Sequence, residues 1–249
     1  MKVKALYIWL FATYSAMAQE GTSYIPSPEK VRKELHPPET FSKLTLDLFE
    51  YKPEKKEMKY DISFWFGGDY NKLWLDAEGE HSLKKGNGTI DRLNLYYSRA
   101  ISAFWDLQAG IGTRAIYGNH SENRNYVVLG IRGLAPYWFH IDANLAMDKD
   151  GNTNANLKAE YELLLTQRFI LQPRFESLYS FSDIKMVGIA SGLNYTELGL
   201  RLRYEVRREF APYIGVSWIK HYGKTKRLLR EEGEDTQRLG LVMGVRMWF

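Results

Sequence analysis

The last eleven residues of the chain, LGLVMGVRMWF, alternate strictly between apolar positions and other positions. The six side chains on the apolar positions are Leu239, Leu241, Met243, Val245, Met247 and Phe249. Successive side chains of a β-strand point to opposite faces, so these six share one face. That face needs an apolar environment, which is either the core of a soluble protein or the hydrocarbon of a membrane.

Eleven further segments repeat this two-residue period after Phe41. Their alternating runs lie at residues 44–48, 62–66, 73–77, 93–97, 107–111, 127–131, 141–147, 157–163, 171–175, 198–204 and 214–218. No window of comparable length shows the helical period, so the pattern indicates strands. A last strand that ends on Phe with this alternation resembles the closing strand of outer-membrane β-barrels. We therefore predict an all-β fold, an antiparallel transmembrane β-barrel of about twelve strands.

The connections between these runs differ in length. Short connections lie at 67–71, 100–104, 134–137, 166–169 and 207–212, and longer polar ones near 52–57, 82–89, 117–123, 148–153, 181–192 and 223–236. Membrane barrels have tight turns at the periplasmic rim and longer loops at the other rim. Five turns and six loops join an even number of strands, and they place both ends of the barrel on the periplasmic side.

The N-terminal segment predicts export. Lys2 and Lys4 precede a short apolar stretch, and Ala16-Met17-Ala18 matches a signal-peptidase site, so residues 1–18 are expected to be a signal peptide. The polar residues 19–40 hold four of the eight prolines and predict a flexible leader. Residues 41–249 remain for the barrel.

The composition narrows the class of protein. A charged fraction of 26% and a mean hydropathy of −0.40 exclude a helical membrane protein but not a barrel, whose strands alternate. The net charge of +4 is too small and dispersed to indicate nucleic-acid binding. Aromatic residues make up 14% of the chain and gather near the short connections, which predicts an aromatic girdle at the periplasmic interface.

The strand faces opposite the apolar runs carry charged residues, which we expect to point into the lumen. They include Asp76, Glu78, Glu80, His140, Asp142, Lys158, Glu160, Glu162, Arg174, Glu176, Arg201, Arg203 and Glu205. A hairpin around the DKDGN segment is predicted to pair Asp142 with Glu160 and His140 with Glu162. The next turn would then place Glu162 near Arg174 and Glu160 near Glu176.

This lumen permits two interpretations. The four residues His140, Asp142, Glu160 and Glu162 are candidate ligands of a metal cation, with hard carboxylate and imidazole donors. Alternatively, the acidic and Arg side chains form a lattice of salt bridges that braces the wall. The lattice is favoured, because an Arg beside a carboxylate satisfies it without metal.

Signals of catalysis are absent from the sequence. The five His form no HxH or HExxH pair, and no hydrolase signature accompanies the serines. We therefore expect no catalytic residues and no enzyme activity. A barrel lipase is the enzymatic alternative, which lipid hydrolysis by the refolded protein would reveal.

Five long segments resemble the copper resistance protein B family (CopB/PcoB). They are GGDYNKLWLDAEGE (67–80), LYYSRAISAFWDLQAGI (95–111), GLAPYWFHIDA (133–143), AEYELLLTQRFILQPR (159–174) and TELGLRLRYEVRREFAPYIGV (196–216). The resemblance implies an outer-membrane protein of a Gram-negative bacterium that binds, sequesters or passes copper ions. It also implies a periplasmic multicopper oxidase as a partner, and we expect a monomer in contact with outer-membrane lipid.

One feature departs from that family. Many members carry a Met- and His-rich stretch before the barrel, whereas the leader here offers only His36 and no Met after Met17. Copper contacts would then have to come from the lumen or the loops. A small general porin without a dedicated copper site is the alternative function, and copper-sensitive growth of a deletion strain distinguishes the two.

Overall fold

The computed structural model describes residues 39–249, except 85, 119–121, 184–189 and 232. The expected signal peptide (1–18) and nearly all of the expected leader (19–40) therefore lie outside the described residues. Residues 40–249 form one compact unit.

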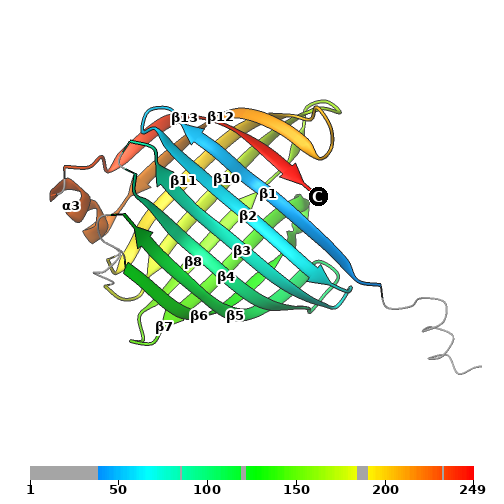
Figure 1. The fold of residues 1–249 in the computed structure, drawn as a ribbon, viewed down its shortest axis with the longest axis horizontal. Coiled ribbons are helices and arrows are strands. Elements are labelled where there is room, and N and C mark those ends of the chain that lie inside the picture. The colour runs from blue at the N-terminus through cyan, green and yellow to red at the C-terminus, as the bar shows by residue number, and fades with distance from the viewer. Residues whose placement is uncertain (1–38, 85, 119–121, 184–189, 232) are drawn as a thin grey trace, which may run out of the picture. The chain divides into compact units, whose positions relative to one another are not determined.

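Thirteen strands follow one another around the wall of a closed antiparallel barrel (Figure 1). They are β1 (Phe41–Lys52), β2 (Glu57–Gly67), β3 (Asn71–Ser82), β4 (Gly88–Ala100), β5 (Trp105–Tyr117), β6 (Glu122–Ala135), β7 (Phe139–Asp148), β8 (Thr153–Glu160), β9 (Leu163–Leu164), β10 (Phe169–Ser180), β11 (Gly192–Tyr204), β12 (Phe210–His221) and β13 (Gln237–Trp248). The short β9 continues β8, and both pair with β10. The wall therefore has twelve strand positions, which confirms the predicted fold.

The last strand closes the barrel as predicted. β13 pairs with β12 on one side and with β1 on the other. The backbone of Phe249 exchanges two hydrogen bonds with Leu44, of 2.9 and 2.8 Å. The apolar face of β13 points outward, because Leu239 and Leu241 are 65% and 60% exposed.

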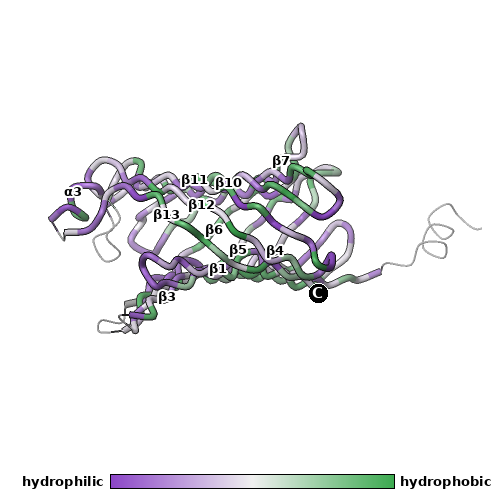
Figure 2. The backbone as a smooth tube through the Cα atoms, turned by 90° about the horizontal axis from the view of Figure 1, so that it is seen from above, coloured by the Kyte–Doolittle hydropathy of each residue, from purple (hydrophilic) through white to green (hydrophobic). Residues whose placement is uncertain are grey.

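The side chains are distributed inside out compared with a soluble protein. Apolar side chains such as Leu129 and Ile214 are exposed on the outside, whereas Asp76 and Arg201 are buried within. Hydrophobic and hydrophilic positions alternate along the tube in Figure 2, with β1 and β3 on one side and β10 and β11 on the opposite side. Charged side chains that face lipid are costly, so this arrangement suits a wall surrounded by hydrocarbon.

The prediction that Leu48 of β1 faces outward is wrong. Leu44 is exposed, but Leu48 is buried and Phe49 takes the outward position instead. The cause is a β-bulge, since the pairing with β2 moves from Leu46 opposite Ile62 to Leu48 opposite Asp61. The extra residue, Asp47, reverses the alternation for the rest of the strand.

The predicted register of the DKDGN hairpin is wrong by two residues. His140 lies opposite Glu160, and Asp142 lies opposite Lys158. The turn is tighter than expected because the Asp148 carboxylate accepts backbone N–H groups from Asp150 and Asn152. The next pairing moves by the same amount, so Arg174 lies opposite Glu160 and Glu176 opposite Lys158.

β8 and β9 are separated by Tyr161 and Glu162, next to Pro173 of β10. The Tyr161 N–H donates to the Pro173 carbonyl at 3.1 Å, but proline has no N–H to return. The ladder is interrupted there, and it resumes where Leu163 pairs with Leu171.

The expected difference in length between the short turns and the longer loops is only partly confirmed. Four of the six longer connections, at 53–56, 83–87, 118–121 and 149–152, are no longer than the turn at 205–209. The other two are long, and the one after β12 contains the helix α3 (Gly223–Glu231), which the sequence pattern did not predict. We call the rim with α3 the loop end and the opposite rim the turn end (Figure 1).

Exposed aromatic side chains gather at the turn end, where the girdle was expected. Tyr70, Phe104, Tyr137 and Trp138 lie in its short connections and are between 61% and 83% exposed. Tyr137 and Trp138 both have positive φ angles, a conformation that few residues other than glycine adopt. No helix among the described residues is long and apolar enough to span a membrane.

A charged lumen as the candidate functional site

Seven ionised side chains from five strands, β2, β3, β4, β8 and β10, meet across the middle of the lumen. We call this group the lumen belt: Lys59, Asp61, Glu78, Arg92, Lys158, Arg174 and Glu176. Each side chain is at most 12% exposed. The alternation of each strand explains the belt, because every member lies on the face opposite the lipid-facing residues.

Lys158 is at the centre of the belt. Its Nζ donates a hydrogen bond of 2.9 Å to Asp61 on β2 and another to Glu78 on β3. Asp61 also accepts a bond of 3.1 Å from Arg174 on β10. A salt-bridge network therefore spans the lumen from β8 to β2 and β3.

Lys59 extends the belt toward the loop end. Its Nζ lies 3.3 Å from Glu197 and 3.7 Å from both Glu78 and Glu176. Three carboxylates around one buried ammonium offset the cost of its desolvation. Removing any one partner would leave a buried charge without compensation, so the network is sensitive to single changes.

A second buried group connects β1 with β11 and β12. The Arg201 Nε donates to Glu50 at 2.8 Å, and the Tyr213 hydroxyl donates to the same carboxylate at 3.3 Å. Glu50 and Arg201 are almost completely buried. Sequence analysis missed Glu50, because the bulge at Asp47 changes which residues of β1 face inward.

Cavities lie on both sides of the belt. The largest of the four described here, at the turn end, has a volume of about 510 Å³ and is lined by residues of β1–β8 and β13. Two adjoining cavities of about 370 and 200 Å³ lie at the loop end and share Glu80, Glu197 and His221. A small central cavity of about 50 Å³ lies between the two ends.

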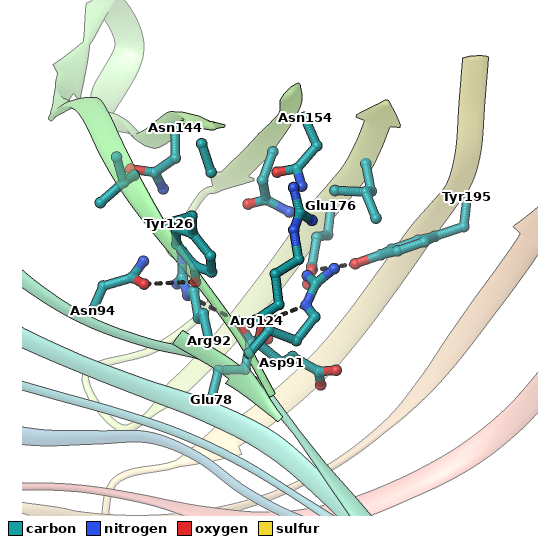
Figure 3. A pocket seen from close by; sticks show the side chains of 15 residues that line it. Glu78, Asp91, Arg92, Asn94, Arg124, Tyr126, Asn144, Asn154, Glu176 and Tyr195 are labelled. Carbon is teal, nitrogen blue, oxygen red and sulfur yellow. Dashed lines mark hydrogen bonds and ion pairs between the residues drawn. The ribbon is translucent and has the colours of Figure 1, made fainter. Parts of the chain in front are cut away.

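Figure 3 shows the central cavity. Tyr126 reaches it from β6 and Tyr195 from β11, on opposite sides. The Tyr126 hydroxyl donates to Asn94 at 2.7 Å, and the Tyr195 hydroxyl donates to Glu176 at 2.8 Å. The remaining space is large enough for only a few water molecules.

The loop-end cavities carry an excess of acidic residues. Their acidic residues are Glu54, Glu78, Glu80, Asp91, Glu176, Glu197, Glu234 and Asp235, and their basic residues are Lys52, Lys55, Lys59, Arg114 and Arg238. A cavity wall with this excess raises the local concentration of cations. The turn-end cavity is nearly balanced, with seven acidic and six basic residues.

Helix α3 lines part of the loop end. Thr225 donates from its hydroxyl to Asn194 of β11, and Leu228 and Leu229 line the loop-end cavities. Outside the strands, the Asp183 carboxylate accepts the Ser191 N–H at 2.7 Å and lies 3.0 Å from the Lys224 ammonium. These bonds lower the pKa of Asp183 to about 2.

All four candidate metal ligands line the turn-end cavity. The structure places His140 opposite Glu160, but it engages all three carboxylates in salt bridges. Arg132 and Arg92 contact Asp142, Arg174 contacts Glu160, and Arg203 and Arg246 contact Glu162. Within the described residues, no group of three or more His, Cys, Asp or Glu side chains is arranged to hold a metal ion. The observed contacts therefore favour the lattice interpretation.

Comparison with known proteins gives consistent matches over the barrel. Residues 40–249 match the family described as copper resistance protein B precursor (CopB). The chain is 40% identical over 190 residues to copper resistance protein B of Escherichia coli, covering 76% of this chain and 62% of that protein. It is 37% identical over 192 residues to the copper resistance protein B homolog of Pseudomonas syringae pv. tomato, covering 77% and 64%. The chain thus spans less than two thirds of either relative.

Two solved porins share the fold. The KdgM porin has a TM-score of 0.50 and 12% identity, with 85% of this chain and 99% of that chain covered. The NanC porin has a TM-score of 0.51 and 11% identity, with 83% and 99% covered. At these identities the likeness concerns the architecture of the barrel alone.

Proposed function

We propose that this chain, which belongs to the copper resistance protein B family, contributes to copper resistance by binding copper ions in a lumen that its salt bridges keep closed. The membership of this family and the outer-membrane barrel fold support a role in copper resistance. The observation that carries the finer proposal is the lumen belt. It fills the centre of the barrel with paired charges, and cavities remain on either side.

Closure has a physical basis in the belt contacts. A solute that crosses the lumen must separate pairs such as Lys158 with Asp61, whose side chains are at most 10% exposed. Separating a buried pair leaves charges without partners, which costs several kcal/mol. An open water-filled porin lacks such a barrier. In this proposal, the barrel contributes to copper resistance because it restricts the passage of copper ions through the lumen and retains them there.

The turn-end cavity is the proposed place of copper binding. The His140 imidazole lies opposite Glu160 in the ladder and interacts electrostatically with Glu162. An imidazole and a carboxylate suit divalent copper better than monovalent copper, which prefers sulfur ligands. Asp142 and Glu162 complete the proposed donor set, but each must loosen its Arg contacts to join it.

Calorimetry tests this site. Divalent copper titrated into the refolded barrel in detergent is expected to bind weakly, and His140→Ala is expected to weaken binding further. His221→Ala is the matched control, because His221 lines the loop-end cavities instead. Identical binding by wild type and the His140 variant would remove His140 from the site.

The cellular role needs a separate test. A deletion strain that carries wild-type protein on a plasmid is expected to grow at copper concentrations that inhibit the empty strain. Growth that is equal with and without the gene would reject the copper role. A periplasmic copper-oxidising partner belongs to this proposal, and we assign the barrel itself no catalytic step.

A general porin is the second candidate, because the fold resembles the KdgM and NanC porins. That function requires an open lumen. Planar-bilayer recordings of the wild-type barrel decide between the two, since a porin conducts steadily and a closed barrel does not. Large copper-independent conductance would favour the porin.

A further inference from the structure

We propose that Arg92 is the constriction of the lumen, the side chain that separates the loop-end and turn-end cavities and opposes the passage of cations. This proposal rests on the closed lumen proposed above and names the residue that sets it. It concerns small inorganic cations as a class, of which divalent copper is one.

The position of Arg92 between the cavities is unusual. Six residues line both the central cavity and the larger loop-end cavity, so these two spaces are closely connected. Of the described residues that line the central cavity, Arg92 alone also lines the turn-end cavity. The larger loop-end cavity shares no lining residue with the turn-end cavity. A path along these cavities therefore passes Arg92.

Strand alternation turns Arg92 into the lumen, and a β-bulge beside it brings in Asp91 as well. The pairing of β3 with β4 moves from Glu78 opposite Arg92 to Gly79 opposite Ile90, which leaves Asp91 as the extra residue. Both Asp91 and Arg92 consequently line lumen cavities, although neighbours on a regular strand point to opposite faces. Bulges often redirect side chains in this way near functional sites.

Two carboxylates hold the guanidinium across the opening. Its Nε lies 3.1 Å from Glu78 on β3, and its Nη1 lies 3.6 Å from Asp142 on β7. The Arg92 side chain is 12% exposed. Figure 3 shows it beside Glu78 at the base of the central cavity. The contacts from two separate strands fix the side chain in the lumen rather than along the wall.

The positive charge of Arg92 opposes the passage of cations at this position. The acidic excess of the loop-end cavities attracts cations toward the centre. Arginine stays protonated at any physiological pH, so a cation that arrives there meets a permanent positive charge. Charged constrictions of this kind exclude cations in other pores. Cations therefore collect at the loop end without crossing.

Replacing Arg92 by alanine tests the proposal. The change removes the guanidinium, connects the central and turn-end cavities, and leaves Glu78 and Asp142 facing the opening. In planar bilayers with potassium chloride, Arg92→Ala is expected to conduct several-fold more than wild type. The reversal potential across a salt gradient is expected to show preference for potassium over chloride.

Arg124→Ala is the matched control. Arg124 lines the same central cavity and is held at 2.7 Å by Asp148, but it does not line the turn-end cavity. Its variant is expected to conduct like wild type. Unchanged conductance in Arg92→Ala, or an equal increase in Arg124→Ala, would overturn the role of Arg92.

Folding must be verified in each variant, for which the faster gel migration of unheated folded barrel serves. If Arg92→Ala fails to fold, Arg92→Gln keeps most of the side-chain volume without the charge, and it is expected to lose the exclusion of potassium. Retained exclusion would contradict the proposal. Because potassium and chloride carry the current, the result does not depend on copper. A wild-type barrel that already conducts strongly would instead reject the closed lumen itself.

Discussion

Lys158 of β8 donates a hydrogen bond of 2.9 Å to Asp61 of β2, a residue 97 positions earlier in the chain, across the centre of the barrel. Both side chains are at most 10% exposed. The bond joins two parts of the wall that share no ladder, since β8 pairs with β7 and β10. The lumen belt thus cross-links the barrel from within.

Removing one partner of this contact is expected to destabilise the barrel strongly. Lys158→Met leaves the buried carboxylates of Asp61 and Glu78 with less compensation, and such losses cost about 3–5 kcal/mol. Tryptophan fluorescence during urea unfolding in lipid vesicles measures the change. Lys72→Met is the control, because the side chains of Lys72 and its partner Asp106 are more exposed, at 20% and 17%. There we expect less than about 1 kcal/mol. Equal losses in both variants would contradict a special role of the belt.

A charge on the outer face is expected to be costly in proportion to its depth. Leu129 of β6 is 59% exposed on the outside of the wall. Leu129→Arg is expected to lower the free energy of unfolding in vesicles by about 2–4 kcal/mol near the membrane midplane. Leu83→Arg, in the connection between β3 and β4, is expected to change little. A harmless arginine at position 129 would show that this face does not meet lipid.

The bulge of β1 permits a deletion that ordinary strands do not. Deleting Asp47 restores simple alternation and keeps Leu48 inward and Phe49 outward, at the cost of the contact with Arg246. Deleting Leu46 instead forces the Asp47 carboxylate toward lipid. Gel migration of unheated samples is expected to show folded barrel for the first variant only. Folding of both would mean that the bulge does not set the register.

The contact between Asp183 and Lys224 predicts acid sensitivity at the loop end. The pKa of Asp183 is lowered from 3.8 to about 2, so its stabilising contribution is complete above pH 3.8 and is lost as the pH falls through about 2. Pepsin cleavage within α3, measured relative to cleavage of an unfolded peptide of the same sequence at each pH, is expected to be faster at pH 2 than at pH 4. Asp183→Asn is expected to remove that difference, and a persistent difference would assign it to another group.

The alternation of side chains made the wall predictable. Period two identified twelve strand positions and the closing strand, because a barrel in lipid must hide every charge on one face. The pattern could not reveal that Asp47 is an extra residue, because β1 has apolar residues at both even and odd positions around the bulge. Nor did it reveal α3, whose sequence lies within a polar connection and shows only a short helical period.

The types of side chain in the candidate site could be predicted from the sequence, but which residues pair with one another could not. Sequence analysis identified the inward charges and favoured a lattice, and the structure shows Glu160 and Asp142 engaged by Arg residues. The predicted strand register was wrong by two residues, because the Asp148 side chain accepts a backbone hydrogen bond within its own turn and shortens that turn. Contacts across the lumen, such as Arg92 with Asp142, join strands that are not adjacent, and no local pattern encodes them.

The separation in sequence between side-chain partners at the closure of the barrel also constrains assembly. Glu50 meets Arg201, which lies 151 positions later in the chain, and Asp47 meets Arg246, which lies 199 positions later. A half-built sheet therefore carries unneutralised acids and bases that the bilayer would reject. Membrane insertion and closure of the barrel must consequently proceed together. A single hairpin inside the membrane is not a stable intermediate, because its backbone edges and charged side chains have no partners.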